Sequence, residues 1–346
     1  MRKLIKNIFD VSKLLWKNQI SITDGLGVIN EFESEFKKFV GTKYALATNN
    51  GTSALHSAYF GLNLKEGDEV IVPSYTWHAT VMPLLTLGVK PIFAEINKNT
   101  LTLDPIDVEK KITKKTKAIV LVHLYGNVCD MKSFLNLKEK HNIFLIEDCS
   151  HAFSAKYNEK IVGSFGDVAC FSLQGAKAVS GGEAGILVTN NREIYEKALV
   201  LGHQSRLKKE LTISSLRKYE KTGAGFKYRP HPLAIVLALN SLTALKEKNT
   251  KNIEKINFLE RYLSEFKDIE VVKTSDNSFR GSIDGVRVIF NGEIQNKIKF
   301  IQFLIKKGVR IREETFPLLH KQPIFGKEIL LPLTEEIHKR IIHINI

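Results

Sequence analysis

Short apolar runs alternate with helical stretches along the first half of the chain. The segments GTSALHSAYFGL (51–62) and DPIDVEKKI (104–112) predict helices between the runs. The runs themselves predict strands buried on both faces, and helical crossovers make such strands mostly parallel. The pattern therefore predicts an α/β domain whose ligands bind beyond the carboxyl ends of the strands. The predicted strands span residues 44–50, 69–75, 90–96, 116–126, 142–150, 167–173 and 184–191.

The pattern changes after residue 191. Helices are predicted to about residue 267, followed by strands at 269–273 and 284–290 and a helix at 293–308. This arrangement predicts a smaller α+β C-terminal domain. We place the boundary in the polar stretch at 246–250, which gives a large domain of residues 1–246 and a small domain of residues 247–346. The large domain begins with an amphipathic helical arm, because Lys, Asn and Asp interrupt its apolar residues too often for a secretion signal.

Composition and charge limit the classes of protein and of binding partner that the sequence allows. The chain of 346 residues is 43% hydrophobic, and no apolar run reaches the roughly 20 residues of a membrane span. Cys129, Cys149 and Cys170 lie in or beside apolar segments, which favours free thiols in a reducing cytoplasm over disulfides. The net charge of +14 suits anionic partners such as phosphorylated metabolites. Nucleic acid is not favoured, because no recognition motif accompanies the charge.

The first candidate site is TNNGTSAL, residues 48–55, where a strand gives way to a helix. Backbone N–H groups at the helix start, together with the hydroxyls of Thr52 and Ser53, suit an anion such as phosphate. Gly51 allows a close approach of the backbone. An ordinary helix cap explains the same residues equally well. The motif is neither a P-loop nor a dinucleotide-binding turn.

The second site is FLIEDCSH, residues 144–151, where two carboxylates follow a buried strand. Glu147 and Asp148 are expected to point to opposite faces of the sheet. A buried carboxylate needs a partner, which is either a ligand or the next loop. A metal site made of Asp148, Cys149 and His151 is less favoured, because the sequence has no second cluster with metal-ligand spacing.

The third site is CFSLQGAKAVSGGEAG, residues 170–185, which carries one lysine among small residues. Lys177 is a solvated turn residue, a phosphate anchor or a nucleophilic amine. An amine, a buried acid at Asp148 and a phosphate site are the three groups that pyridoxal phosphate needs. All three are predicted on strand ends of one sheet. A further strand end, PSYTWHAT, offers Trp77, which either stacks on a ligand ring or packs in the core, and His78, which has no assigned role.

These segments resemble the DegT/StrS-type pyridoxal-phosphate-dependent sugar aminotransferases, from about residue 20 to about residue 325. The resemblance implies a three-layer α/β/α large domain with the aspartate aminotransferase architecture, known as fold type I. Relatives usually continue for a few tens of residues beyond the end of this chain, so the small domain is expected to be shortened. The matching segments include FESEFKKFVGTKYALATNNGTSALHSA (32–58), GDEVIVPSYTWHAT (67–80), IEDCSHA (146–152), GSFGDVACFSLQGAKAVSGGEAGILVTNN (163–191) and GFKYRPHPLAIVLAL (225–239).

The resemblance also implies roles for individual residues. Lys177 would form the Schiff base with pyridoxal 5′-phosphate and carry a proton between substrate and cofactor, and Asp148 would hold the pyridinium nitrogen. Lys227 would reach the cofactor phosphate of a neighbouring subunit, which implies a homodimer with shared active sites. The other residues implied to bind the cofactor are Gly51, Thr52, Ser53 and Ser172 at its phosphate, Trp77 on its ring, and His151 near the ring and its 3′ oxygen.

The implied activity is transfer of an amino group from glutamate or glutamine to a keto-sugar. The favoured acceptor is a 4-keto-6-deoxy nucleotide sugar, used for surface polysaccharide or glycan biosynthesis. The segments SLQ (172–174) and KYRPHP (227–232) also indicate a keto-cyclitol of the inosose type. A pyridoxal-phosphate-dependent sugar dehydratase is a further alternative, although such relatives lack the lysine found here at Lys177. The short C-terminus leaves a degenerate or regulatory member as the last alternative.

Overall fold

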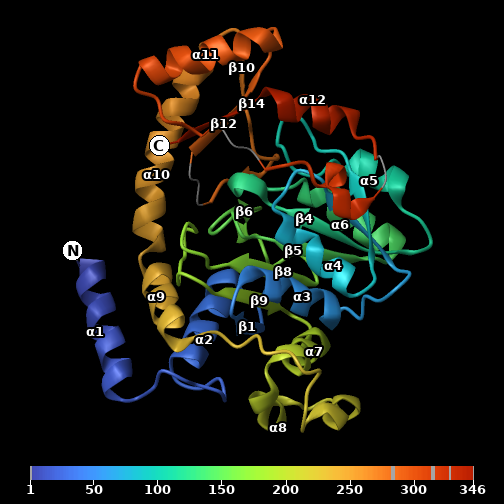
Figure 1. Cartoon of the computed structure of the whole chain (residues 1–346), viewed down its shortest axis with the longest axis vertical. Coiled ribbons are helices and arrows are strands. Elements are labelled where there is room, and N and C mark those ends of the chain that lie inside the picture. Colours follow the sequence, from blue (N-terminus) through green and yellow to red (C-terminus); the bar gives the residue numbers. More distant parts are fainter. Residues whose placement is uncertain (1, 282–284, 313–315, 327–328, 346) are drawn as a thin grey trace.

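A computed structural model describes residues 2–281, 285–312, 316–326 and 329–345 of the chain. Seven strands form its large sheet (Figure 1), in the spatial order β1-β9-β8-β5-β4-β2-β3. Neighbouring strands are parallel except where they pair with β9, so six strands run in one direction and end at one edge. The predicted strands are confirmed, each shorter than predicted, as β1 Tyr44–Thr48, β2 Glu69–Pro73, β3 Lys90–Ala94, β4 Thr116–Val122, β5 Phe144–Asp148, β8 Val168–Ser172 and β9 Gly185–Thr189.

Helices cover both faces of this sheet, which confirms the three-layer α/β architecture. Successive residues of a strand face opposite layers, so Val70 and Val72 lie in one apolar core and Ile71 lies in the other. The first core includes residues of α3 Gly51–Gly61, α4 Met82–Thr86, α7 Arg192–Gly202 and α8 Leu207–Glu210. The second includes residues of α2 Val28–Val40, α5 Pro105–Lys111, α6 Met131–His141 and α9 Pro232–Thr243.

The N-terminal helical arm is α1, Arg2–Trp16, which lies beside α9 (Figure 1). The Asn240 Nδ2 group donates hydrogen bonds of 3.0 Å to Asn7 Oδ1 and to Asp10 Oδ2, and these bonds attach the arm to the large domain. Within the described residues, no helix is both long and apolar enough to cross a membrane. The three cysteines are free and buried, as predicted.

The small domain is built on a four-stranded sheet in the order β10-β12-β14-β13. Its strands are β10 Ile269–Val271, β12 Gly285–Phe290, β13 Ile311–Arg312 and β14 Ile341–Asn345, and its helices are α11 Ile294–Lys306 and α12 Pro332–Arg340. The helix α10, Leu245–Leu263, connects this domain to α9, so the predicted boundary at residue 246 lies inside a helix. A separate three-stranded sheet joins β11 Ser278–Phe279 to β6 Lys156–Tyr157 and β7 Lys160–Ile161 of the large domain.

A buried ion pair fixes the first strand of the large sheet. Arg206 donates from Nη1 to Glu33 Oε1 at 2.8 Å and from Nη2 to Glu33 Oε2 at 3.0 Å. Glu33 Oε1 also accepts the backbone N–H of Ala47 at 2.9 Å, just before the loop that follows β1. Burial raises the pKa of Glu33, although Arg206 opposes this shift. The pair therefore connects α2 to the strand that leads into the first candidate site.

We predict that Arg206→Met destabilises the chain by about 3–5 kcal/mol, because the substitution leaves the Glu33 carboxylate buried without its guanidinium partner. The measurement is urea unfolding followed by circular dichroism. The matched control is Lys38→Met, which removes an exposed ion pair with Glu35 on the same helix α2 and should change the stability little. Equal stability of the two variants would contradict the prediction.

Candidate active site

A cavity of about 580 Å³ opens at the edge where the six aligned strands end. Its wall includes residues at or just beyond the ends of β1, β2, β4, β5 and β8. Parallel strands bring their carboxyl ends together, which is why residues far apart in the sequence meet here. Seven of the nine predicted site residues line the cavity, namely Gly51, Thr52, Trp77, Asp148, His151, Ser172 and Lys177.

The start of α3 forms one end of the cavity. Asn50 caps this helix, because its side chain accepts the backbone N–H of Ser53 at 2.8 Å. Gly51 follows, and a Cβ at that position would come within 2.8 Å of Ser172 Cβ. Glycine is therefore required for the helix start to lie against the end of β8. Gly51, Thr52 and Ser172 all line the cavity here, and a helix start is suited to an anion.

Asp148 lies at the end of β5 and is 5% exposed. Its Oδ2 accepts the hydroxyl of Thr80 at 2.8 Å, and its Oδ1 accepts the backbone N–H of Ser150 at 3.1 Å. The Thr80 oxygen also lies 3.1 Å from Thr76 Oγ1. Since the Thr80 proton goes to the carboxylate, Thr76 donates to Thr80. Two neighbouring segments thus hold the Asp148 carboxylate in one orientation facing the cavity.

Lys177 lies in the loop between β8 and β9 and is half-buried at the cavity wall. The loop is ordered by its own polar groups. The backbone N–H of Lys177 donates to Gln174 O at 2.8 Å, and the Gln174 side chain accepts the backbone N–H of Ala176 at 2.8 Å. Gly181 N donates to Leu173 O at 2.9 Å and closes the loop. These bonds fix the backbone of the loop, and Lys177 lines the same cavity as Asp148.

Aromatic rings line a further part of the cavity wall. The rings of Tyr125, His151 and Phe316 lie 5.7–5.8 Å apart pairwise and are nearly parallel. Trp77 packs edge-on against Phe316 at 5.8 Å and is 51% exposed. Of the two interpretations of Trp77, packing in the buried core is therefore wrong. His78 is exposed, and its ring contacts that of Trp77.

Two predicted residues do not line the cavity of this chain. Ser53 is 7% exposed, and its backbone N–H is bonded to Asn50. Lys227 is exposed in the segment at 225–229. The next residue in that segment, Tyr228, accepts the backbone N–H of Asn49 at 2.7 Å, so the segment lies against the loop after β1. The role expected of Lys227 involves a second subunit, and it stays a prediction.

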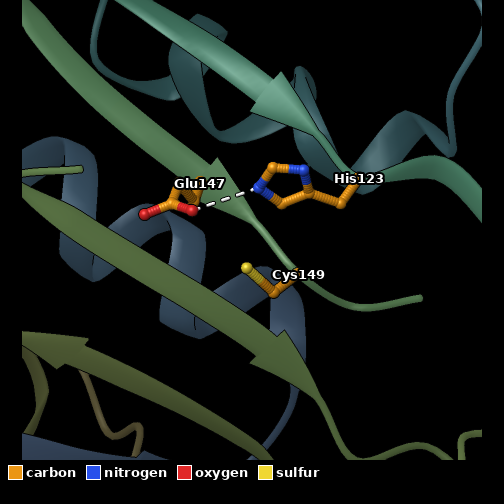
Figure 2. A group of neighbouring side chains, drawn as sticks. All are labelled: His123, Glu147 and Cys149. Atoms are coloured by element: carbon orange, nitrogen blue, oxygen red, sulfur yellow. Dashed lines mark hydrogen bonds and ion pairs between the residues drawn. The ribbon is translucent and has the colours of Figure 1, made fainter. Parts of the chain in front are cut away.

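A separate polar cluster lies in the interior, made of His123, Glu147 and Cys149 (Figure 2). A ring nitrogen of His123, a carboxylate oxygen of Glu147 and the Sγ of Cys149 lie within 4.8 Å of one another, and atoms of these types can bind a metal ion. Glu147 already accepts four hydrogen bonds, one of 3.1 Å from His123 Nε2 and three of 2.6–2.9 Å from backbone N–H groups of the loop at 163–166. Burial disfavours its charge, but His123 and these N–H groups outweigh burial and lower its pKa. The cluster thus fixes the loop that precedes β8.

The comparison with known proteins agrees with this geometry. The sequence matches the model of the DegT/DnrJ/EryC1/StrS aminotransferase family over residues 7–346. The chain belongs to this family. The predicted resemblance and the predicted aminotransferase class are therefore confirmed.

Individual relatives cover most of the chain. A GDP-perosamine synthase of Vibrio cholerae is 34% identical over 91% of this chain and 84% of its own length. The dTDP-3-amino-3,6-dideoxy-alpha-D-galactopyranose transaminase of Aneurinibacillus thermoaerophilus is 32% identical, over 92% of this chain and 85% of its own. Among solved structures, an aminotransferase from Psychrobacter cryohalolentis superposes with a TM-score of 0.87 at 25% identity, over 97% of this chain and 90% of its own.

The sequence reasoning missed several cavity residues. Thr80 had a weak signal, because it follows Trp77 by three residues in a segment already assigned to a strand end. Tyr125 lies just beyond β4 and adopts a positive φ of 57°, which no local pattern indicates for tyrosine. Phe316 comes from the C-terminal part of the chain, almost 140 residues after Lys177. Only the folded arrangement brings this ring to the cavity.

We predict that Thr80→Val lowers aminotransferase turnover by about tenfold, because the isosteric side chain no longer donates to Asp148. Thr80 acts through Asp148, so Thr80→Ser, which keeps the hydroxyl, should restore most of the rate. Steady-state kinetics should show the change in kcat, with a smaller change in the KM for the donor. Wild-type turnover in the valine variant would show that the hydroxyl does not position the carboxylate.

Proposed function

We propose that this chain transfers an amino group from glutamate or glutamine to a keto-sugar, with pyridoxal 5′-phosphate as cofactor. The favoured acceptor is a 4-keto-6-deoxy sugar linked to a nucleotide, in the biosynthesis of a surface polysaccharide or glycan. One observation carries the proposal, namely that the amine of Lys177, the carboxylate of Asp148 and the anion-binding start of α3 share one cavity. The printed names of the relatives above, which concern GDP- and dTDP-linked amino sugars, support the substrate class.

The residues of the cavity fit this cofactor. Gly51, Thr52 and Ser172 would hold the phosphate. Because Gly51 lies close to Ser172, the hydroxyl groups of Thr52 and Ser172 and the backbone N–H groups of the helix start are available to the same anion. When bound, pyridoxal phosphate carries the amino group between the two substrates and withdraws electrons from the carbon that loses a proton. Trp77 and His151 belong to the wall beside which its ring would lie, and the aromatic side chains there exclude water.

Asp148 would keep a proton on the ring nitrogen of the cofactor. Thr80 and Ser150 each donate a hydrogen bond to this buried carboxylate. The same two bonds prevent the carboxylate from rotating away. The carboxylate would therefore face the ring nitrogen of a bound cofactor.

Lys177 would perform two tasks in turn. Its Nζ would first hold the cofactor covalently through the aldehyde carbon. The free Nζ would then take the proton from the α-carbon of the donor, and in the second half-reaction it would deliver a proton to the carbon that was the ketone of the acceptor. The hydrogen bonds of the loop fix the backbone from which Lys177 would reach the cofactor.

We predict that the enzyme loaded with cofactor loses its visible absorption band when glutamate or glutamine is added and regains it when an acceptor ketone is added. Acceptors to be screened are 4-keto-6-deoxy sugars linked to GDP or dTDP, and keto-cyclitols. Lys177→Ala should abolish the band and reduce the turnover at least about a thousandfold, because both the covalent attachment and the proton carrier are lost. Its circular dichroism spectrum should match that of the wild type.

The possible outcomes separate the alternatives. Recovery of the band with a keto-cyclitol alone would replace the nucleotide-sugar assignment. Binding of cofactor without response to any donor would indicate a degenerate member. Wild-type turnover in Lys177→Ala would overturn the proposal, and release of water from the sugar without amination would favour a dehydratase.

We also propose a homodimer in which Lys227 of one subunit reaches the cofactor phosphate of the other. Exposed apolar side chains support an association of this kind. Trp16 at the end of α1 is 92% exposed, and Phe226, adjacent to Lys227, is 50% exposed. Large apolar side chains in water favour burial against a partner.

We predict that sedimentation equilibrium gives twice the chain mass of 39.1 kDa. Lys177→Ala and Lys227→Ala should each be nearly inactive alone. Co-expressed, they should recover roughly a quarter of the wild-type activity, because random pairing gives one complete site in each mixed dimer. A monomer in solution would exclude the shared site, and so would full activity of Lys227→Ala.

A further inference from the structure

A buried polar cluster joins the C-terminal part of the chain to the end of β2. Its members are Ser74, which is fully buried, His320, which is 2% exposed, and Glu335 on α12. Ser74 Oγ lies 2.6 Å from His320 Nδ1, and His320 Nε2 lies 3.2 Å from Glu335 Oε1. None of these three side chains lines the cavity, so the cofactor assignment does not explain them.

The two ring nitrogens of His320 have different roles in this cluster. Hydrogen bonds from Lys321 and His320 lower the pKa of Glu335 to about 2, so its charged carboxylate only accepts and the ring proton lies on Nε2. Burial lowers the pKa of His320, which favours a neutral ring whose Nδ1 accepts the hydroxyl proton of Ser74. Ser74 Oγ in turn accepts the backbone N–H of His320 at 3.3 Å. The ring is therefore held at both nitrogens.

Both ends of the Ser74–His320 bond lead to rings of the cavity wall. Trp77 follows Ser74 by three residues, and Phe316 precedes His320 by four. The Phe316 carbonyl also accepts a hydrogen bond of 2.9 Å from Nε2 of His338 on α12. The rings of Trp77 and Phe316 meet at a centroid distance of 5.8 Å. The cluster thus joins the two chain segments from which these rings extend.

Apolar packing already attaches the segment at 316–321 to the large domain. Leu318 is 8% exposed and Leu319 is 1% exposed, and both belong to the first apolar core. Burying a hydroxyl and an imidazole beside them costs desolvation, which their hydrogen bonds offset. Hydrogen bonds are directional, whereas apolar contacts are not, so a fully bonded polar cluster specifies one position of the segment. The cluster therefore adds precision to an attachment that exists without it.

We propose that His320 is a positioning residue of the active site, which holds Phe316 against Trp77 through its bond to Ser74. The residue acts through the chain segments that it joins and does not itself reach the cavity. The kinetic part of the test below rests on the proposed function. The spectroscopic part needs no substrate and is independent of it.

Four variants separate the two bonds of the His320 ring. His320→Gln places an amide nitrogen near the position of Nε2, toward Glu335, and loses the acceptor for Ser74. Ser74→Ala removes the same bond from the other side. His320→Asn places an amide oxygen near the position of Nδ1 and keeps the bond to Ser74. The matched control is Lys321→Met, which removes a half-exposed ion pair with Glu335 and leaves both bonds of His320 in place.

The first measurement is acrylamide quenching of Trp77 fluorescence in the cofactor-loaded enzyme. The chain has two tryptophans, so all proteins carry Trp16→Phe, which leaves Trp77 alone. His320→Gln and Ser74→Ala should each increase the quenching and shift the emission to longer wavelength, because Phe316 no longer packs firmly on the Trp77 ring. The double variant should change no more than either single variant, since the same bond is lost in all three. His320→Asn and Lys321→Met should resemble the parent.

The second measurement is kcat/KM for an acceptor ketone that the wild type aminates. His320→Gln and Ser74→Ala should each lower it about tenfold, because a displaced wall misorients the bound substrate. His320→Asn should recover most of the loss. A purely structural role would lower the unfolding temperature and leave both kcat/KM and Trp77 quenching unchanged in the folded enzyme.

Unchanged quenching in His320→Gln would overturn the proposal. So would additive effects of His320→Gln and Ser74→Ala, or an equal effect of Lys321→Met. If His320→Gln does not fold, Ser74→Ala compared with His320→Asn gives the same decision. A parent enzyme that aminates no acceptor, with the expected differences in quenching among its variants, would refute the proposed function and support the role of His320.

Discussion

Six strands of the large sheet end at one edge, and the positions of the candidate cofactor-binding residues in the cavity depend on this shared direction. Helical crossovers on both faces bury the sheet, so its polar groups can reach solvent only at the strand ends. The loops there carry the helix start at Gly51, the carboxylate of Asp148 and the amine of Lys177. Groups that lie 29 to 126 residues apart in the sequence thus share one cavity.

The two acids at the end of β5 show how one strand serves two purposes. Glu147 points into the interior, where His123 and the loop at 163–166 satisfy its charge. Asp148 points to the cavity, where Thr80 and Ser150 satisfy only part of its hydrogen-bonding capacity. Successive side chains of a strand point to opposite faces of the sheet, so Glu147 stabilises the fold while the neighbouring Asp148 is available to a ligand.

The small domain and the helix α10 that leads to it also contribute side chains to this cavity, but not from the ends of large-sheet strands. Phe316 adds an aromatic ring beside Tyr125 and His151, and α10 adds the polar stretch at 248–252. Since α10 is anchored in both apolar cores, its polar stretch lies between them. The cavity is therefore a feature of both domains, although its cofactor residues belong to the large one.

The sequence by itself determined the strands and the α/β class, because apolar periodicity is a local signal, and its strand-end motifs together with the family resemblance identified seven of the residues at the cavity. The predicted strands extend beyond the C-terminal ends of the observed strands, because the polar residues that follow each strand belong to the loops of the site. Only the tertiary structure decided that Thr80 bonds Asp148, that Phe316 reaches the aromatic wall and that α10 faces the cavity. These contacts depend on how separate elements pack in three dimensions, and no local pattern of residues encodes that packing.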